Sequence, residues 1–128
     1  MEYQAVNVRT SLGTITVINV YVPPTPDAVP PPFDDLFQHN NTIIVGDTNA
    51  RNLLWASNTN DARGRALEDA VSAHGYVVLN TGEGTYQTYH GSMTHIDVSL
   101  ASNQLATKCR WATSKNTMGS DHVPIIIL

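Results

Sequence analysis

The sequence predicts a mixed α/β sheet, and three observations carry this prediction. Two alternating segments, 4–10 and 13–22, are separated by a short glycine turn, which is typical of a β-hairpin. One helical pattern begins at Asp61, and short apolar or alternating segments fill most of the chain after residue 40. A hairpin, one helix and several further strands in a chain of 128 residues predict one α/β domain.

The predicted hairpin is rich in Val, Ile and Thr, and its turn lies at Leu12-Gly13. Its second strand ends at Pro23-Pro24, because proline cannot donate a hydrogen bond to a neighbouring strand. Six of the ten residues at 23–32 are proline, which predicts a stiff, extended connector. Such a connector suits an interdomain linker, but the segments on both sides indicate one α/β layer. We therefore interpret residues 23–40 as an internal crossover, with one or two helical turns at 33–38.

The second half of the predicted sheet surrounds the helix. The segment 41–47 is apolar between Thr42 and Gly46, which predicts a strand covered on both faces, and an irregular loop is expected at 50–60. The helix is expected to end at Gly75. Its apolar stripe contains Ala66, Leu67, Ala70, Val71 and His74. Further strands are predicted at 76–80, 85–89, 94–101, 107–113 and 123–128.

The composition is that of a globular protein with few charges and mild acidity. Hydrophobic residues make up 41% of the chain, charged residues 14%, and the formal net charge is −4. A domain that binds nucleic acid through bulk charge would be basic, so that mode is excluded, whereas a metal ion can supply local positive charge. The single cysteine, Cys109, excludes an internal disulfide and a cysteine-rich zinc site, and we expect it to be a small core residue.

The chain also lacks the patterns that direct proteins to membranes or to secretion. No apolar segment approaches the roughly 18 residues that a membrane span needs. Met1 leads directly into polar residues rather than into a signal peptide. We therefore expect no membrane partner and a reduced, intracellular setting.

Asp47 and Asn49 follow the 41–47 strand and form the first polar cluster. Residues i and i+2 of an extended backbone point the same way, so both side chains can face one site. Taken alone, the same triplet also suits a turn, with Asp47 as a turn residue and Asn49 as a cap.

Asp97 lies in the middle of a predicted strand whose Ile96, Val98 and Leu100 share the opposite face. Burial of a carboxylate among apolar neighbours is costly unless the carboxylate is paired. His122, directly before the last strand, is the natural partner. An Asp–His pair fixes the tautomer of the imidazole and raises its basicity, as phosphate and acyl-transfer sites require.

Asp121 precedes His122 in Ser120-Asp121-His122, which taken alone also suits an ordinary turn. Beside the Asp–His pair, Asp47 and Asp121 are hard oxygen ligands. Such ligands suit Mg²⁺ or Mn²⁺ rather than zinc.

Four motifs occur in order along nearly the whole chain: Asn19-Val20-Tyr21-Val22-Pro23-Pro24, Gly46-Asp47-Thr48-Asn49-Ala50, Ile96-Asp97 and Ser120-Asp121-His122-Val123-Pro124. They resemble the C-terminal part of the endonuclease/exonuclease/phosphatase superfamily. The intervening motifs are most similar to endonuclease domains of non-LTR retrotransposons: Leu54-Trp55, Asn60-x-x-Arg63-Gly64-x-x-Leu67, Val78-Leu79-Asn80-Thr81-Gly82 and Thr85-Tyr86. Thr48 departs from the pattern, because retrotransposon members usually carry a bulky apolar residue there.

The resemblance implies a role for each matching residue in metal-assisted hydrolysis of a phosphodiester by water. Asp47 would bind or deprotonate the attacking water, and Asn49 would orient it and contact the phosphate. Asp121, with Asp47, would hold Mg²⁺ or Mn²⁺. His122 would neutralise the phosphate while Asp97 holds its ring. Tyr21 matches a tyrosine that donates a hydrogen bond to the phosphate.

The resemblance also implies a four-layer α/β sandwich of two packed sheets that begins before the hairpin at 4–22. We expect residues 1–128 to form one partial domain that lacks the N-terminal part and its metal-binding glutamate, since Glu2 lies outside any matching motif. The other strands of the hairpin's sheet would then lie outside this chain, and a second copy or a partner polypeptide would complete the sheet. With fewer metal ligands, we expect weak or no nicking by this chain alone.

Three functions remain open. The first is a metal-dependent DNA endonuclease domain of retrotransposon type, which would act in the nucleus. The second is a binding or vestigial module that keeps the fold without activity, and the third is a phosphoesterase for small phosphoesters or lipid headgroups. The endonuclease-like motifs argue against the third, and nicking activity would separate the first two.

Overall fold

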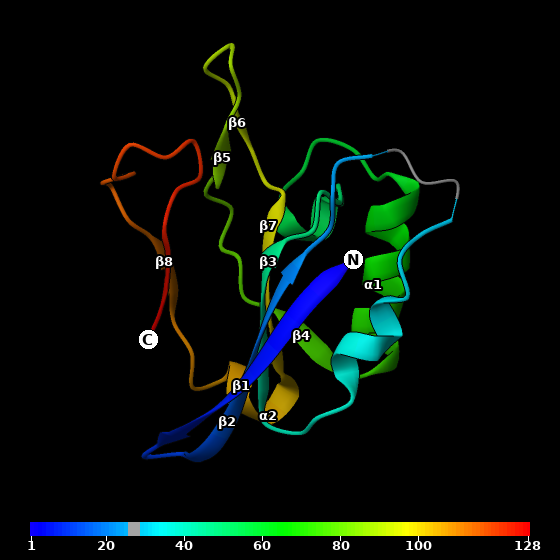
Figure 1. Ribbon diagram of the computed structural model, residues 1–128, viewed down its shortest axis with the longest axis vertical. Helices are drawn as coiled ribbons and strands as arrows, with labels where there is room; N and C mark the ends of the chain where they lie inside the picture. Colours follow the sequence, from blue (N-terminus) through cyan, green and yellow to red (C-terminus); the bar gives the residue numbers. More distant parts are fainter. Residues whose placement is uncertain (26–28) are drawn as a thin grey trace.

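The computed structural model describes residues 1–25 and 29–128 (Figure 1). Its strands are β1 (Glu2–Thr10), β2 (Gly13–Tyr21), β3 (Thr42–Asp47), β4 (Tyr76–Val78), β5 (Tyr86–Gln87), β6 (Met93–Thr94), β7 (Asp97–Ser102), β8 (Trp111–Thr113) and β9 (Ile125–Ile127). Its helices are the 3₁₀ helices η1 (Phe33–Phe37) and η2 (Leu53–Trp55) and the α-helices α1 (Ala62–Ala73) and α2 (Asn103–Ala106).

The main sheet has five strands in the order β1-β2-β3-β7-β4. The β2–β3 pair is parallel, and the other pairs are antiparallel. Two small antiparallel sheets, β5–β6 and β8–β9, complete the described strands. The prediction of a mixed α/β sheet is therefore confirmed, and Figure 1 shows α1 on one side of the main sheet and β8 on the other.

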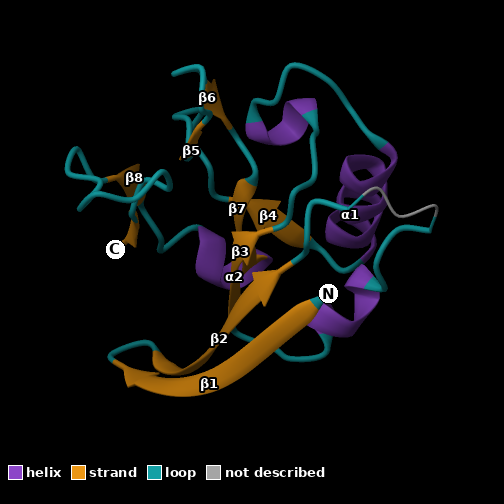
Figure 2. Ribbon diagram, turned by 45° about the horizontal axis from the view of Figure 1, so that its top comes forward, coloured by secondary structure: helices purple, strands orange, loops and turns teal. Residues whose placement is uncertain are grey.

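The hairpin belongs to this main sheet, which corrects the expectation that its partner strands lie outside the chain. β2 pairs with β3 from Thr16↔Thr42 to Tyr21↔Asp47. Because the two strands are parallel neighbours, the segment between them crosses over within one sheet. Part of the expected proline-rich connector, residues 26–28, lies outside the described residues, and η1 supplies the expected helical turn. β1 is the outer strand, and all nine of its residues are exposed (Figure 2).

The core lies between the main sheet and the helices. It contains Ile18, Val20, Ile44, Val98 and Leu100 from the sheet, Val22 directly after β2, Phe33, Leu36 and Phe37 from η1, Leu67, Ala70 and Val71 from α1, and Ala50 and Trp55 from the loop after β3. The expected stripe of α1 is confirmed except at its end, because His74 is exposed, where it stacks on Phe37 and contacts Asp34 at 2.8 Å. The irregular loop at 50–60 also contains η2.

The opposite face of the sheet is less covered than the sequence predicts. Thr42 and Ile44 are buried, but Ile43 and Val45 on the other face of β3 are only half-buried. With Val17 they line an apolar hollow of about 300 Å³ whose far wall is formed by Ile125 and Ile127 of β9. The small β8–β9 sheet therefore covers only part of this face.

The five strands predicted after the helix are shorter than expected or divided, and in two of them other hydrogen bonds use the backbone. The chain at 94–101 changes partner at Ile96, since β6 pairs with β5 whereas β7 pairs with β3 and β4. At 107–113, turn hydrogen bonds from the N–H groups of Lys108 and Cys109 follow α2, so β8 begins only at Trp111. Cys109 is half-buried rather than a core residue, and burial raises the pKa of its thiol.

Gly46 allows β2 and β3 to approach where the site begins. Its φ is +150°, and a Cβ atom there would lie 1.9 Å from the carbonyl oxygen of Val20. Only glycine fits such an approach.

No helix in the described part of the chain is long and apolar enough to cross a membrane.

Candidate active site

Three strand ends place predicted site residues side by side. Tyr21 at the end of β2 pairs with Asp47 at the end of β3, and Asp47 pairs with Asp97 at the start of β7. Directly paired residues point to the same face of a sheet. This row therefore puts the Tyr21 hydroxyl and two carboxylates at one end of the sheet, on the face opposite α1.

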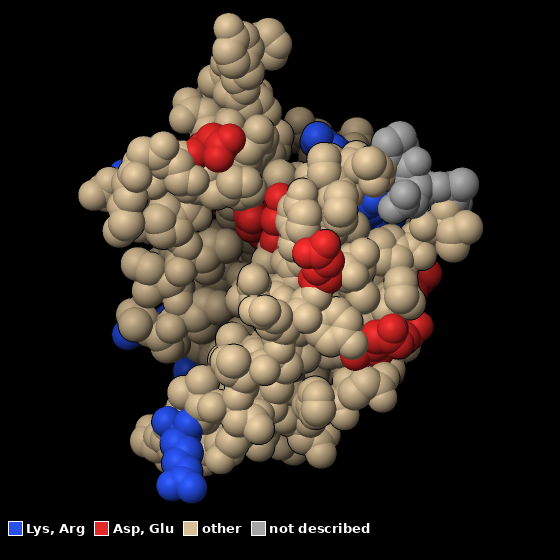
Figure 3. All heavy atoms as spheres, in the orientation of Figure 1, with Lys and Arg blue, Asp and Glu red and all other residues tan. Residues whose placement is uncertain are grey.

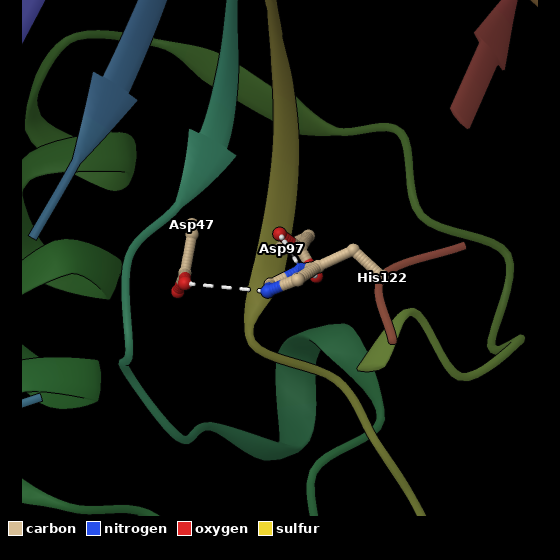
Figure 4. A group of neighbouring side chains, drawn as sticks. All are labelled: Asp47, Asp97 and His122. Atoms are coloured by element: carbon tan, nitrogen blue, oxygen red, sulfur yellow. Dashed lines mark hydrogen bonds and ion pairs between the residues drawn. The ribbon is translucent and has the colours of Figure 1, made fainter. Parts of the chain in front are cut away.

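His122 completes a cluster with the two carboxylates (Figure 4). Its Nδ1 lies 3.1 Å from both Oδ1 and Oδ2 of Asp97. Its Nε2 faces Oδ2 of Asp47 at 4.0 Å. With an ionised Asp97 as the acceptor, Nδ1 carries the proton and Nε2 faces Asp47.

The segment 121–123 is held by pairing beside the 85–87 segment. The N–H of Gln87 donates to the carbonyl of Asp121, and the N–H of Val123 donates to the carbonyl of Thr85, both at 2.8 Å. The ring of Tyr86 packs against the ring of His122 with a centroid separation of 4.9 Å. Backbone pairing on both sides of His122 therefore fixes the position of its ring.

Asp97 is buried, and two residues to which the sequence assigned no role support its backbone. The N–H of Asp97 donates to the Thr85 hydroxyl at 3.2 Å. The Asn80 side chain donates to the Asp97 carbonyl at 3.0 Å and accepts from the N–H of Ser99 at 2.8 Å. Thr85 and Asn80 lie in motifs that carry the resemblance, which is the sequence signal that could have identified them.

Asn49 reaches the site in a different way from that expected. The extended backbone ends at Asp47, and Asn49 has φ +45°. The two side chains therefore do not share a face in the way that residues i and i+2 of a strand do. The N–H of Asn49 donates to Oδ1 of Asp47 at 3.0 Å, and its side-chain amide donates to the Val22 carbonyl at 2.8 Å. A side chain–backbone turn therefore brings Asn49 back beside Asp47.

Burial raises the pKa of Asp47 above its ordinary value of 3.8. The hydrogen bond from the N–H of Asn49 opposes this shift, while the nearby charge of Asp97 adds to it. The positive charges of His122 and Arg63 lower the pKa, but burial outweighs them. A carboxylate with a raised pKa is a better proton acceptor than an ordinary aspartate, which suits a general base.

Arg63 ties the connector after β2 to the turn that carries Asn49. Its Nη1 donates to the carbonyl of Pro23 at 2.9 Å and to that of Asn49 at 3.4 Å, and its Nη2 donates to the carbonyl of Thr25 at 2.8 Å. The fork of a guanidinium suits several carbonyls at once.

The site opens into a cavity of about 350 Å³. It is lined by Tyr21, Pro24, Asp47, Asn49, Arg51, Tyr86, Thr88, Thr94, Ile96, Asp121 and His122. Figure 3 shows acidic atoms in the hollow between the β8–β9 side and the main sheet. A larger cavity, about 600 Å³, contains His39 and His74 but no carboxylate among its lining residues, so volume alone does not mark the site.

The donor set at this cavity fits a divalent cation. Ligand atoms of Asp47, Asp97 and His122 lie within 4.8 Å of one another. Asp121 is exposed and lines the same cavity, but it is not a member of this group. Carboxylate oxygens on one side of an open cavity are the ligands that Mg²⁺ and Mn²⁺ prefer.

Glu2 extends the row of paired residues formed by Tyr21, Asp47 and Asp97, although it lies near the start of the chain. It pairs directly with Tyr21, so the registers place Glu2, Tyr21, Asp47 and Asp97 in sequence across four strands. Glu2 and Tyr21 line a separate hollow of about 440 Å³.

Known proteins match both the sequence and the fold. Residues 15–126 match the family described as endonuclease-reverse transcriptase. The RNA-directed DNA polymerase from mobile element jockey of Drosophila melanogaster is 31% identical over 125 residues, which is 94% of this chain and 14% of that protein. The probable RNA-directed DNA polymerase from transposon BS, also of Drosophila melanogaster, is 31% identical over 134 residues, which is 99% of this chain and 14% of that protein.

Solved structures share the fold at lower identity. The endonuclease domain of TRAS1, a telomere-specific non-LTR retrotransposon, has a TM-score of 0.82 and 22% identity, and the match covers 98% of this chain and 60% of that chain. The 3′-5′ exonuclease NExo from Neisseria meningitidis has a TM-score of 0.68 and 17% identity, and the match covers 97% of this chain and 64% of that chain. The mixed α/β fold of this chain therefore matches the endonuclease/exonuclease/phosphatase-type fold that the resemblance implies. On its family match, this chain belongs to the endonuclease-reverse transcriptase family, the retrotransposon branch of the endonuclease/exonuclease/phosphatase superfamily.

Proposed function

We propose that this chain carries the water-activating side of a metal-dependent DNA endonuclease site. The observation that carries the proposal is the placement of His122, whose Nδ1 contacts Asp97 while its Nε2 faces Asp47 across 4.0 Å at the cavity wall. This places a carboxylate and an imidazole nitrogen side by side in the wall of a cavity that a phosphate can enter.

The reaction proposed is hydrolysis of one phosphodiester bond. The oxygen of a water molecule forms a bond to phosphorus as the bond to one ester oxygen breaks. Asp47 takes the proton from the water, and the departing oxygen takes a proton from solvent. The half-buried position of Asp47 and its raised pKa support this residue as the base.

His122, Asn49 and Tyr21 serve the phosphate. His122, held by Asp97, presents a positive charge to the phosphate oxygens as negative charge develops on them. The Asn49 amide is fixed beside Asp47 and orients the water. Tyr21 is 43% exposed at the cavity wall, from which its hydroxyl can donate to a phosphate oxygen.

Asp47 and Asp121 are the proposed holders of Mg²⁺ or Mn²⁺, since both line the cavity and offer hard oxygen ligands. When bound, such an ion polarises a phosphoryl oxygen and lowers the pKa of water.

The exposed β1 strand supports a further part of the proposal. The chain spans 14% of the length of the curated relatives and 60% of the TRAS1 endonuclease chain. We propose that a second copy of this chain or another polypeptide covers the β1 edge, because an open strand edge favours pairing. Sedimentation and amide hydrogen exchange test this, and a monomer with protected amides across residues 4–22 would refute it.

The experiment that tests the nuclease proposal is a supercoiled-plasmid nicking assay with Mg²⁺ or Mn²⁺. Wild-type protein is compared with Asp47→Ala and His122→Ala. Asp69→Ala and His39→Ala are the matched controls, because both residues are exposed and neither lines the candidate cavity. From this chain alone we expect weak nicking or none, and any nicking is expected to be abolished by both site variants and preserved by both controls.

Each other outcome points to a different function. Binding of DNA without nicking under either metal would favour a vestigial binding module. Hydrolysis of a small phosphomonoester that requires Asp47 and His122, without nicking, would favour a small-molecule phosphoesterase. Action on chromosomal DNA would place the protein in the nucleus, which fluorescence microscopy of the tagged protein tests.

A further inference from the structure

Arg51 lies where two hollows of the surface meet. One is the cavity of about 350 Å³ that contains Asp47 and His122, and the other is an adjoining cavity of about 340 Å³ beside the start of α1. Arg51 lines both cavities, together with Asn49. Arg51 is the only basic Lys or Arg residue among those that line the first cavity.

The backbone of Arg51 is fixed against α1. Its N–H donates to Oδ1 of Asp61 at 3.2 Å, and its carbonyl accepts from the N–H of Asp61 at 2.9 Å. The helix lies so close that a Cβ atom on Gly64 would be 1.8 Å from the Arg51 carbonyl oxygen. These contacts set the point from which the long side chain extends.

The guanidinium of Arg51, in contrast, has no fixed partner. Within residues 1–25 and 29–128 it makes no hydrogen bond or ion pair, and the residue is exposed. Arg63, which lines the second cavity, is engaged with the carbonyls of Pro23 and Thr25. Because the backbone of Arg51 is fixed and its guanidinium is unpaired, this side chain is suited to bind an anionic group of another molecule.

The charge around the site indicates which kind of anion Arg51 would bind. Asp47 and Asp121 make the first cavity acidic, and the chain has seven Lys and Arg against eleven Asp and Glu. A polyanion that approaches such a surface needs local cationic contacts beyond the reacting phosphate. A guanidinium can bind two phosphate oxygens at once.

We propose that Arg51 binds the phosphate that neighbours the scissile phosphate on the cleaved DNA strand, and that the strand runs from the first cavity into the second. This inference rests on the proposed nuclease function. Arg51 is a positioning residue, since it acts on a phosphate that does not react. It sets the register of the strand, so its loss raises KM for nicking and leaves kcat nearly unchanged.

The test measures the binding of a fluorescein-labelled duplex oligonucleotide by anisotropy between about 50 and 200 mM salt. The variants are Arg51→Gln, Arg51→Lys and the control Arg65→Gln. Arg65 is exposed on α1, donates to the carbonyl of Asn60 and lines neither cavity. Thermal unfolding of each variant shows that the fold is kept.

We expect Arg51→Gln to weaken binding and to reduce the slope of log affinity against log salt by about 0.9, the value of one phosphate contact on a duplex. Arg51→Lys keeps the slope and loses part of the affinity, because it retains the charge but not the two-point contact. Arg65→Gln behaves as the wild type.

An unchanged slope in Arg51→Gln, an equal loss in Arg65→Gln, or no measurable binding by the wild type would overturn the inference. The nicking assay separates this failure from failure of the proposed function. Nicking with an Arg51-independent slope refutes only the subsite. An Arg51-dependent slope without nicking refutes only the nuclease and leaves a strand-binding surface.

Discussion

The Nδ1 atom of His122 lies 3.1 Å from each carboxylate oxygen of Asp97, across 25 residues of sequence. This contact is held from both sides, by the pairing of residues 121–123 with 85–87 and by the hydrogen bond from the Asp97 N–H to Thr85. The imidazole therefore has one fixed orientation, with Nε2 toward Asp47 and the cavity.

Asp97→Asn tests that orientation. A carboxylate can only accept from Nδ1, whereas a neutral amide can accept from it or donate to it, so the tautomer and the direction of Nε2 are no longer fixed. We expect kcat for nicking to drop by about 10- to 100-fold. The plasmid nicking assay measures this loss, and Asp69→Asn is the matched control. An unchanged kcat would show that Asp97 has no part in setting the ring.

Asp47→Asn is expected to stabilise the metal-free fold. Because burial raises the pKa of Asp47 above 3.8, the folded chain holds this proton more tightly than the unfolded chain. The ionisation of Asp47 therefore costs no stability below the unfolded pKa of about 3.9. The cost grows as the pH rises from there through the raised folded pKa, and above that pKa the cost is constant. The variant should melt at a higher temperature than the wild type at pH 7 in EDTA, with no gain near pH 3.

The control for this prediction is Asp69→Asn, the same charge change at an exposed position of α1. It should alter the free energy of unfolding by less than about 0.5 kcal/mol. A lower melting temperature for Asp47→Asn at pH 7 would mean that the Asn49, His122 and Arg63 contacts outweigh burial at this carboxylate.

Gly46→Ala tests the close approach of β2 and β3 below the site. The added methyl group would lie 1.9 Å from the Val20 carbonyl oxygen, and the strand pair must separate to admit it. We expect the free energy of unfolding in urea to fall by about 3 kcal/mol or more. Gly75→Ala has φ +68° and open space, so it should cost only about 1–2 kcal/mol. Equal losses in the two variants would contradict the packing argument.

Arg63→Lys tests the tie between the connector and the Asn49 turn. An ammonium cannot reproduce the fork that reaches the carbonyls of Pro23, Thr25 and Asn49. We expect the free energy of unfolding to fall by about 1–3 kcal/mol and hydrogen exchange to accelerate in peptides covering 21–25 and 47–50. Arg65→Lys is the control, and exchange that increases equally in both variants would argue against a specific tie.

Some elements of this fold could be predicted from the sequence because they depend on interactions between residues that are close in the chain. Proline and glycine positions, the period of apolar residues and the strand-like hairpin depend on near neighbours, so the hairpin and α1 match their predictions closely. Asp97 was also predictable, because a carboxylate in an apolar strand needs a partner wherever the chain supplies one. The limits of the later strands were not, since β6 and β7 are separated by a change of partner at Ile96.

The sequence by itself identified the chemical groups of the candidate site: the acids, the amide, the histidine and the tyrosine. Only the tertiary structure decided that the hairpin joins the main sheet, that Asn49 returns through a left-handed turn, and that Thr85, Asn80 and Arg51 lie at the site. The reason is physical. These features depend on hydrogen bonds and strand pairings between residues distant in sequence, and such pairings are chosen by the packing of the whole sheet rather than by any local pattern.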